Sequence, residues 1–522
     1  MKKVLCALLF VVMLVSCASA YDLANPPVVK IPNGQLMGFM NGNTFTFLGI
    51  PYAQAKRFEK PQSVPAWEGV KSAQSYGTIS PILDQTEVGA DEFVWPHRYW
   101  VQNENCMNLN VWTQSIEESA NKPVIVFFHG GGYRNGSSIE SAAYDGANLS
   151  VYGDVVVVTV NHRLNILGFL DLSRYGEKYA GTANLGMQDL VASLKWVQEN
   201  IKYFGGNPDN VTIFGQSGGG GKVNNLMRMP SAKGLFHKAA ALSSSYGLID
   251  KELNDKIITG TLAKLGLKDV SELETYDYYD LIHAAQAVCT ELGTNWTPEA
   301  DGEVIQAEFC DWANDIPFIG STVFSEFNYS WRFDGKNKNL WTEDEALANL
   351  KAKYGDKAGA IAEEFKKVFP GRKLADAYFY YAAAPVSSTI YYICRRGLEF
   401  ILADKLKTAR APVYEYLFDY EVPVNGGILP FHCSDLIYVF HNVDIPVVSI
   451  ATGGDEAAHK MQDTVADAYL AFMRTGNPST EKLEWKPYTP DEKNIMVFSA
   501  ESKCKVLGDE KLYTLIDEAL AK

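Results

Sequence analysis

The sequence predicts an α/β fold built on a mostly parallel central sheet with helices on both faces. Three β-branched apolar runs, residues 123–128, 154–160 and 210–214, are typical of strands buried on both faces. The segment between the last two runs is amphipathic at helical spacing, which predicts a crossover helix. Its apolar face is formed by Leu190, Leu194, Val197 and Ile201. Alternating strands and helices of this kind indicate an α/β architecture.

The C-terminal half continues the alternation. Residues 316–320 and 411–418 are strand-like. Thr342 and Glu345 have the spacing of a capping box, which predicts that a helix begins there. Segment 461–476 predicts another helix that ends at its glycine. The apolar face of that helix is formed by Val465, Tyr469, Phe472 and Met473.

Composition favours one large globular domain. The chain has 522 residues, 47% of them hydrophobic and 21% charged, which is enough apolar material for a large core. Because no Pro/Ser-rich linker or low-complexity tract divides it, we expect residues 21–522 to form a single domain with helical insertions. The formal net charge is −15 and no basic block is present, so nucleic acid and anionic lipid are disfavoured as partners.

Residues 1–20 predict an export signal. Two lysines precede an apolar run over residues 4–15, and residues 18–20 fit a small-residue cleavage site. Residues 14–17, LVSC, also resemble a bacterial lipoprotein box, so a lipid anchor at Cys17 stays open beside simple secretion. We expect a secreted or periplasmic protein, or an outer-membrane lipoprotein. No other apolar run approaches the ~18 residues that span a bilayer, so no transmembrane segment is expected.

The cysteines beyond the signal show no metal-binding pattern. Six remain, and their spacings contain no CxxC. Export permits disulfides, and Cys289 and Cys310 are the pair nearest in sequence. Free buried thiols are an equal alternative.

The glycine-rich stretch VTIFGQSGGGGKV, residues 211–223, fits two kinds of loop. A phosphate-binding loop needs G-x-x-x-x-G-K-[ST]. Gly221 and Lys222 supply the central pair. The first glycine is replaced by Gln216, and the magnesium-binding hydroxyl is replaced by Val223. The phosphate-loop interpretation therefore fails at two required positions.

The same stretch fits a nucleophile turn. Gly215, Ser217 and Gly219 satisfy G-x-S-x-G, directly after a predicted strand and before a plausible helix. The flanking glycines matter because side chains in so tight a turn would collide with neighbouring backbone. Taken alone, this motif fits an ordinary strand-to-helix turn equally well.

A second motif favours acyl-transfer chemistry. HGGG, residues 129–132, ends an apolar strand upstream of the serine. Glycines there let backbone N–H groups approach a substrate oxygen that gains negative charge. The expected oxyanion donors are the N–H groups of Gly131, Gly132 and Gly218. The presence of both motifs in this order favours an acyl-transfer site over the alternative that each is an ordinary tight turn.

A serine hydroxyl also needs a base and an orienting carboxylate, in the chain order Ser, acid, His. Local features favour His432, in a loop after a strand, and Glu326, also after a strand. Asp301 and Glu303 compete for the acid, although they are typical of a solvated turn. The other downstream histidines are His237, which looks structural, His283 in a helix-like run, and His441 and His459 in polar surroundings.

Collinear blocks over nearly the whole mature chain resemble the type-B carboxylesterases of the α/β-hydrolase fold, a family related to the cholinesterases. The matching blocks are FLGIPYA (48–54), ENCMNLNVW (104–112), HGGGY (129–133), NHRLNILGFL (161–170), FGGNPDNVTIFGQSGGG (204–220), GLFHKAAALSSS (234–245) and RTGNP (474–478). The glycine-rich block is most similar to bacterial secreted members.

The resemblance implies Ser217 as nucleophile, Glu326 as acid and His432 as base. It also supports the three glycine donors. The family often has Glu before the nucleophile and Ala after it, where this chain has Gln216 and Gly218. Cys106 matches a cysteine that is disulfide-bonded upstream in animal members, but residues 21–105 contain no cysteine.

The resemblance implies a carboxylesterase that hydrolyses a small-molecule or polysaccharide-linked ester through an acyl-enzyme, without metal or cofactor. A feruloyl or acetyl-xylan esterase is the first alternative. The aromatic stretch 93–100, which the family places near the gorge mouth, either stacks on a phenolic acid or packs, and packing is favoured. A non-catalytic, cholinesterase-like binding protein is the remote alternative.

Overall fold

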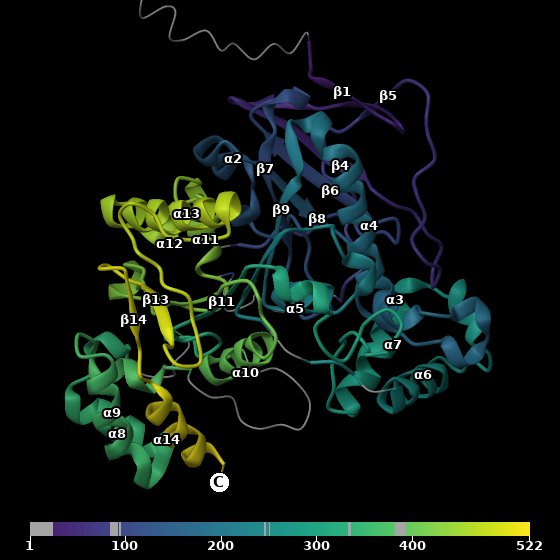
Figure 1. The fold of residues 1–522 in the computed structure, drawn as a ribbon. Helices are drawn as coiled ribbons and strands as arrows, with labels where there is room; N and C mark the ends of the chain where they lie inside the picture. Colours follow the sequence, from purple (N-terminus) through teal and green to yellow (C-terminus); the bar gives the residue numbers. More distant parts are fainter. Residues whose placement is uncertain are drawn as a thin grey trace, which may run out of the picture.

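An 11-stranded sheet runs through the centre of the computed structural model, which describes residues 25–83, 92, 96–244, 247–249, 251–331, 336–381 and 393–521 (Figure 1). Its strand order is β14-β13-β12-β11-β10-β9-β7-β8-β6-β4-β3. The strands are β3 (Phe39–Asn41), β4 (Thr44–Pro51), β6 (Asn108–Thr113), β7 (Lys122–Phe128), β8 (Val156–Val160), β9 (Gly206–Gln216), β10 (Lys238–Leu242), β11 (Phe318–Val323), β12 (Val413–Phe418), β13 (Asn494–Phe498) and β14 (Lys503–Val506). A separate small sheet contains β1 (Val28–Ile31), β2 (Gly34–Met37) and β5 (Val70–Ser72).

The middle of the large sheet is parallel. Strands β8, β7, β9, β10, β11, β12 and β13 pair in parallel, whereas β3, β4, β6 and β14 add antiparallel edges. Every residue of β8, β10, β11 and β12 is buried, as expected for strands covered on both faces. The predicted mostly parallel sheet is confirmed.

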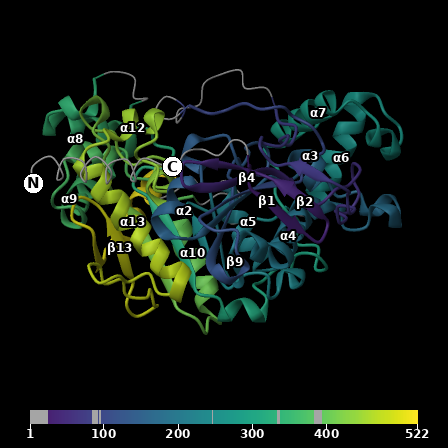
Figure 2. The same cartoon turned by 90° about the horizontal axis from the view of Figure 1, so that it is seen from above.

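Helices cover both faces and extend beyond the sheet. They are α2 (Ala147–Gly153), α3 (Asn165–Phe169), α4 (Leu185–Asn200), α5 (Gly218–Leu226), α6 (Lys251–Leu265), α7 (Tyr278–Glu291), α8 (Glu343–Tyr354), α9 (Ala358–Val368), α10 (Arg395–Leu406), α11 (Leu436–Val439), α12 (Pro446–Thr452), α13 (Glu456–Thr475) and α14 (Glu510–Leu520). Helices α6 and α7 lie at one end of the molecule and α8 and α9 at the other (Figure 2).

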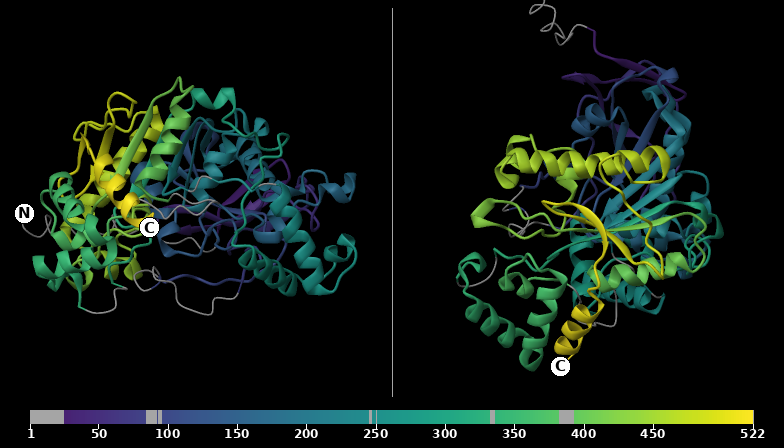
Figure 3. Two further views of the ribbon diagram at one scale, coloured as in Figure 1. Left: turned by 90° about the horizontal axis from the view of Figure 1, so that it is seen from below. Right: turned by 60° about the vertical axis from the view of Figure 1, so that its left-hand side comes forward.

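Two apolar cores lie on opposite faces of the sheet because alternate strand residues point to opposite sides. In β7, Val124 and Val126 face a core shared with α4 and α5. Ile125 and Phe127 face a second core with α11 and α13. Figure 3 shows α13 lying along the sheet on the side away from α10.

The helix predictions hold closely. Leu190, Leu194, Val197 and Ile201 are buried, although Ile201 belongs to the turn after α4. Thr342 and Glu345 form both hydrogen bonds of a capping box at the start of α8. Helix α13 starts at Glu456, earlier than expected, because Asp455 caps it.

The predicted signal, residues 1–20, lies outside the described residues. Within the part of the chain that the structure describes, no helix combines the length and apolar character needed to cross a membrane.

Candidate active site

Polar residues gather where neighbouring parallel strands end. Strand β7 leads into the HGGG segment, β9 into Ser217, β10 into Ser243 and β11 into the loop that holds Glu326. Ligands in α/β sheets bind outside the carboxyl ends of the strands, where loops from adjacent strands converge. The topology therefore brings segments more than 100 residues apart to one edge of the sheet.

Ser217 occupies a strained turn between β9 and α5. Its backbone has φ 60° and ψ −126°, a sparsely populated conformation for a residue with a side chain. The turn is held at both ends, because Ser217 N–H donates to Leu242 O at 2.9 Å and Gly221 N–H donates to Ser217 O at 3.0 Å. This geometry is typical of a serine lifted out of the strand and presented to solvent.

Glycines flanking the serine are required by close backbone approaches. A Cβ at Gly215 would lie 2.4 Å from the carbonyl carbon of Gly219. A Cβ at Gly219 would lie 2.0 Å from Phe128 O at the end of β7. Both distances are far below van der Waals contact, so the collision expected from the motif is confirmed.

The HGGG segment passes directly over the start of α5. Gly131 and Gly132 have φ values of 86° and 58°, which favour glycine. A Cβ at Gly218 would lie 2.7 Å from Gly132 N. The backbone after the serine and the glycine loop are thus in tight contact, and Gly218 begins a helix whose free N–H groups attract negative charge.

His432 and Glu326 form a hydrogen-bonded pair. Nδ1 of His432 lies 2.6 Å from Oε2 of Glu326, and both side chains are almost fully buried. The two loops are also joined by their backbones, because His432 N–H donates to Glu326 O at 3.0 Å. A carboxylate at this position holds the imidazole with its proton on Nδ1 and leaves Nε2 to act as a base.

The carboxylate of Glu326 is bonded on both oxygens. The Ser243 hydroxyl donates to Oε1 at 2.8 Å, and Val323 N–H donates to the same atom at 2.9 Å.

A second buried carboxyl group, that of Asp435, accepts a hydrogen bond from the Tyr416 hydroxyl at 2.6 Å. Burial, with a smaller effect of nearby Glu326, raises the pKa of Asp435 to about 6.

Gln216 contacts the base from the residue before the nucleophile. Its Nε2 lies 3.1 Å from Nε2 of His432, and the Cys433 thiol donates to its Oε1 at 3.0 Å. Among the described residues, no hydrogen bond joins Ser217 Oγ to His432. Such catalytic hydrogen bonds often form only when substrate is bound, and here the Gln216 amide nitrogen lies beside the ring, also 3.3 Å from Nδ1.

One cavity of about 450 Å³ is lined by Ser217, His432 and all three predicted glycine donors. Phe327 and Tyr329 form part of its wall, and the Phe327 ring centroid lies 4.0 Å from that of His432. Apolar walls with a few convergent polar groups are typical of small-molecule sites.

The aromatic stretch 93–100 packs in part and in part lines the active-site cavity. Residues 93–95 lie outside the described residues. Trp100 packs edge-on against Tyr76, with ring centroids 5.9 Å apart, whereas His97 and Tyr99 line the active-site cavity.

The acidic residues and histidines that were alternatives to Glu326 and His432 do not line the active-site cavity. Asp301 accepts three backbone N–H groups in a turn that includes Glu303, as predicted. His441 and His459 contact the acidic side chains of Asp463 and Asp444 away from the cavity. His237 Nδ1 accepts from a backbone N–H, and His283 lies against Tyr279. All six cysteines of residues 25–521 are free thiols, including Cys289 and Cys310.

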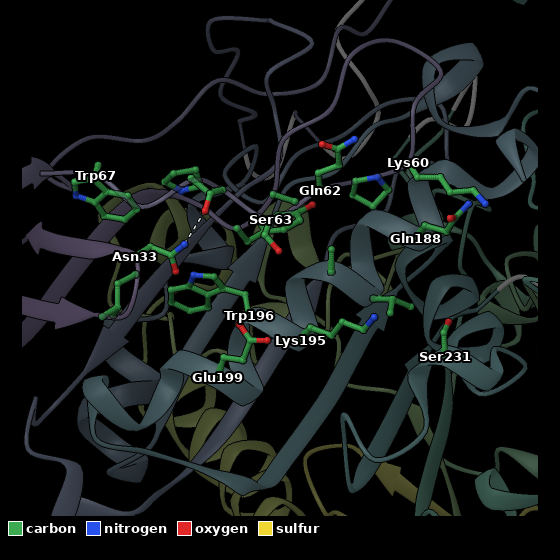
Figure 4. Close-up of a pocket in the computed structure, with 18 residues that line it drawn as sticks. Asn33, Lys60, Gln62, Ser63, Trp67, Gln188, Lys195, Trp196, Glu199 and Ser231 are labelled. Atoms are coloured by element: carbon green, nitrogen blue, oxygen red, sulfur yellow. Dashed lines mark hydrogen bonds between the residues drawn. The ribbon is translucent and has the colours of Figure 1, made fainter. Parts of the chain in front are cut away.

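A second cavity, of about 400 Å³, lies beside α4 (Figure 4). Trp67 and Trp196 line it together with Lys60 and Lys195. Its described lining includes no histidine and none of the proposed triad or oxyanion residues.

The sequence did not single out three residues that contact this machinery. Ser243 and Asp435 contact or flank the acid, and Gln216 was noted only as a departure from a family pattern. For Ser243 a signal existed, since it is the first polar residue after a buried strand whose neighbour ends at the nucleophile.

Comparison with known proteins gives concordant matches over nearly the whole chain. The model of the carboxylesterase family matches residues 25–514. The para-nitrobenzyl esterase of Bacillus subtilis is 31% identical over 91% of this chain and 95% of its own length. The phenmedipham hydrolase of Pseudarthrobacter oxydans is 27% identical over the same shares.

Solved structures agree with these relatives. An esterase of the anaerobe Clostridium hathewayi that can hydrolyse aliphatic aromatic polyesters superimposes with a TM-score of 0.85 at 39% identity, covering 96% of this chain and 99% of that one. A Geobacillus stearothermophilus carboxylesterase superimposes with a TM-score of 0.72 at 31% identity, covering 94% and 99%.

Proposed function

The chain belongs to the carboxylesterase family and has the α/β-hydrolase fold, and from this premise we propose that it hydrolyses carboxylic esters through Ser217, His432 and Glu326 with a covalent acyl-enzyme. The observation that carries this assignment is the 2.6 Å contact between His432 Nδ1 and Glu326 Oε2 beside a cavity that Ser217 also lines.

Ser217 Oγ attacks the ester carbonyl while Nε2 of His432 accepts its proton. Glu326 keeps the other imidazole proton on Nδ1 and stabilises the imidazolium.

The carbonyl oxygen becomes an oxyanion facing the N–H groups of Gly131, Gly132 and Gly218. His432 then protonates the departing alcohol. Water, deprotonated by the same imidazole, attacks the acyl-enzyme, releases the carboxylic acid and restores the Ser217 hydroxyl. Every step uses protons held by the chain or by water.

An aromatic ester is the substrate class that the cavity favours. Phe327 and Tyr329 offer apolar rings within reach of His432, and Tyr99 lines the same cavity. A feruloyl esterase acting on plant cell-wall esters is the second candidate on this ground, because ferulate is a flat phenolic acid. An acetyl-xylan esterase would make little use of these rings.

A non-catalytic binding role would need the reacting groups to be dispensable. The hydrogen bond between His432 and Glu326, beside a cavity that Ser217 also lines, favours catalysis over that role. We further propose that residues 1–20 direct export, with lipidation of Cys17 as the alternative; the mass of the mature N-terminus separates these outcomes.

The proposal is tested by kcat/KM on p-nitrophenyl esters of short and long acids, methyl ferulate and acetylated xylan. We expect turnover that falls by several orders of magnitude in Ser217→Ala while the fold is retained. Preference for methyl ferulate would favour the cell-wall role. Near-wild-type hydrolysis by Ser217→Ala would reject the assignment.

A further inference from the structure

Lys222 is a buried cation directly behind the proposed oxyanion site. It lies in α5, just over one turn beyond Ser217, with none of its surface exposed. Its Nζ donates a hydrogen bond to the backbone oxygen of His129 at 2.8 Å. His129 directly follows β7, and its carbonyl is joined by a planar peptide to Gly130, the first glycine of the loop. Lys222 therefore holds the upstream end of the glycine loop.

Asn225 holds the downstream end. It follows Lys222 by three residues and so lies on the same side of α5. Its Nδ2 donates to the Tyr133 hydroxyl at 3.1 Å, and Tyr133 directly follows Gly132. The Tyr133 ring also lies 5.8 Å from Lys222 Nζ. One helix, which begins immediately after the nucleophile, thus grips both residues that flank the three glycines.

Burying the Lys222 ammonium group in these surroundings costs more free energy than a merely structural position requires. Burial lowers the pKa of this lysine to about 7, and Glu140 opposes the shift. Two neighbouring imidazoles, His129 and His162, are stacked with centroids 5.2 Å apart. Burial, reinforced by Lys222, holds the pKa of both imidazoles well below the usual range, so they stay neutral and Lys222 gains no anionic partner from them. An apolar side chain of similar length would be less costly to bury.

We propose that Lys222 and Asn225 are positioning residues that clamp the glycine loop against α5 and so aim the N–H groups of Gly131 and Gly132 at the oxyanion. This inference rests on the proposed function of Ser217. The three glycines leave the loop without side chains of its own to anchor it, and two of them adopt positive φ values that glycine allows but does not enforce. The clamp adds a side-chain constraint at each end, beside backbone hydrogen bonds such as that from Asn165 N–H to Tyr133 O at 2.8 Å.

Loss of the clamp is expected to affect the transition state more than the bound substrate. The donors matter most when the carbonyl oxygen is charged, and a displacement of about 1 Å costs up to about a hundredfold in rate. A lysine kept only for structure would act on folding stability and leave the chemical step unchanged.

The test compares Lys222→Met and Tyr133→Phe with the wild type and with Lys195→Met, a matched control on the exposed side of α4. Each protein is assayed for kcat and KM on p-nitrophenyl acetate, for inhibition by an aryl trifluoromethyl ketone that mimics the tetrahedral intermediate, and for Tm. We expect kcat of Lys222→Met to fall about tenfold to a hundredfold with KM within about twofold, and inhibitor affinity to fall in parallel. The Tm should stay level or rise.

Tyr133→Phe removes only the hydroxyl that Asn225 reaches, so it keeps the test open if Lys222→Met does not fold. We expect Tyr133→Phe to lower kcat and inhibitor affinity by a smaller factor than Lys222→Met does. If wild-type hydrolysis depends on Ser217 but kcat and inhibitor affinity are unchanged in both variants, the clamp is overturned and the proposed function stands. Wild-type hydrolysis that does not depend on Ser217 would reject the proposed function and the clamp together.

Discussion

Ser243 donates its hydroxyl hydrogen bond to Oε1 of Glu326 at 2.8 Å, on the carboxylate oxygen that His432 does not contact. The carboxylate is thereby fixed from both sides, by a side chain from the end of β10 and by the imidazole it orients. This relationship makes the acid, which had open competitors at the level of sequence, the most constrained member of the proposed triad.

Replacing Glu326 by Gln tests that role. The amide nitrogen would face the Nδ1 proton and favour the wrong tautomer, so we expect kcat to fall by about 10³-fold or more with little change in fold. Steady-state kinetics on p-nitrophenyl acetate measure the effect. Glu303→Gln, at the exposed competitor position, is the control. Activity within tenfold of wild type would remove Glu326 from the triad.

Gln216→Glu tests the contact between the residue before the nucleophile and the base. A carboxylate 3.1 Å from Nε2 would stabilise the protonated imidazole, which cannot accept a proton from Ser217. The acid limb of the kcat/KM profile should therefore move to higher pH in the variant. A profile that superimposes on that of the wild type would show that Gln216 does not influence His432 in solution.

Gly218→Ala tests the close approach of the glycine loop to α5. The added methyl would lie 2.7 Å from Gly132 N, so the loop must move away and the donors lose alignment. We expect kcat to fall about tenfold or more while the Tm changes little. Gly359→Ala in α9, where the added methyl meets nothing within 4 Å, is the control and should be neutral or slightly stabilising. Unchanged kcat in Gly218→Ala would contradict the tight contact.

Lys222 makes folding stability depend on pH. Its pKa is about 7 in the folded protein and near its ordinary value of 10.5 in the unfolded chain, so between these values the unfolded chain binds the extra proton. The free energy of unfolding should therefore rise with pH between these two pKa values. Below about pH 7 the buried lysine is charged, and the folded protein bears the full desolvation cost. Lys222→Met lacks this cost.

The advantage in unfolding free energy of Lys222→Met over wild type should thus be largest below about pH 7. It should shrink as pH rises, by at most about 1.4 kcal/mol per pH unit. Urea titrations at several pH values measure it, with Lys195→Met as the matched control. A difference between variant and wild type that is independent of pH would show that Lys222 keeps its ordinary pKa in the fold.

The central sheet and the glycine-flanked turn at Ser217 were predictable because their signals are local, whereas the pairing of His432 with Glu326 was favoured through chain order and the family resemblance. Runs such as 123–128 and 210–214 are apolar throughout, and a G-x-S-x-G turn requires glycines that the sequence displays directly. The separate sheet of β1, β2 and β5 was not predicted, because its strands are short, of three or four residues, and partly exposed.

Contacts between distant segments could not be predicted from the sequence. Lys222 attracted notice only as half of a failed phosphate-loop motif, and its direction depends on how α5 packs beneath β7. Likewise, the amide of Gln216 reaches His432 and Cys433 across 216 and 217 residues of chain. Such contacts are set by the packing of the whole sheet rather than by local propensity.

The most direct test of the central claim is the site of covalent labelling by a fluorophosphonate, measured by intact mass and peptide mapping. The account predicts one adduct per chain in the wild type, on the peptide that carries Ser217, and none in Ser217→Ala. A wild-type protein that stays unlabelled, or an adduct that maps to another residue, would contradict it.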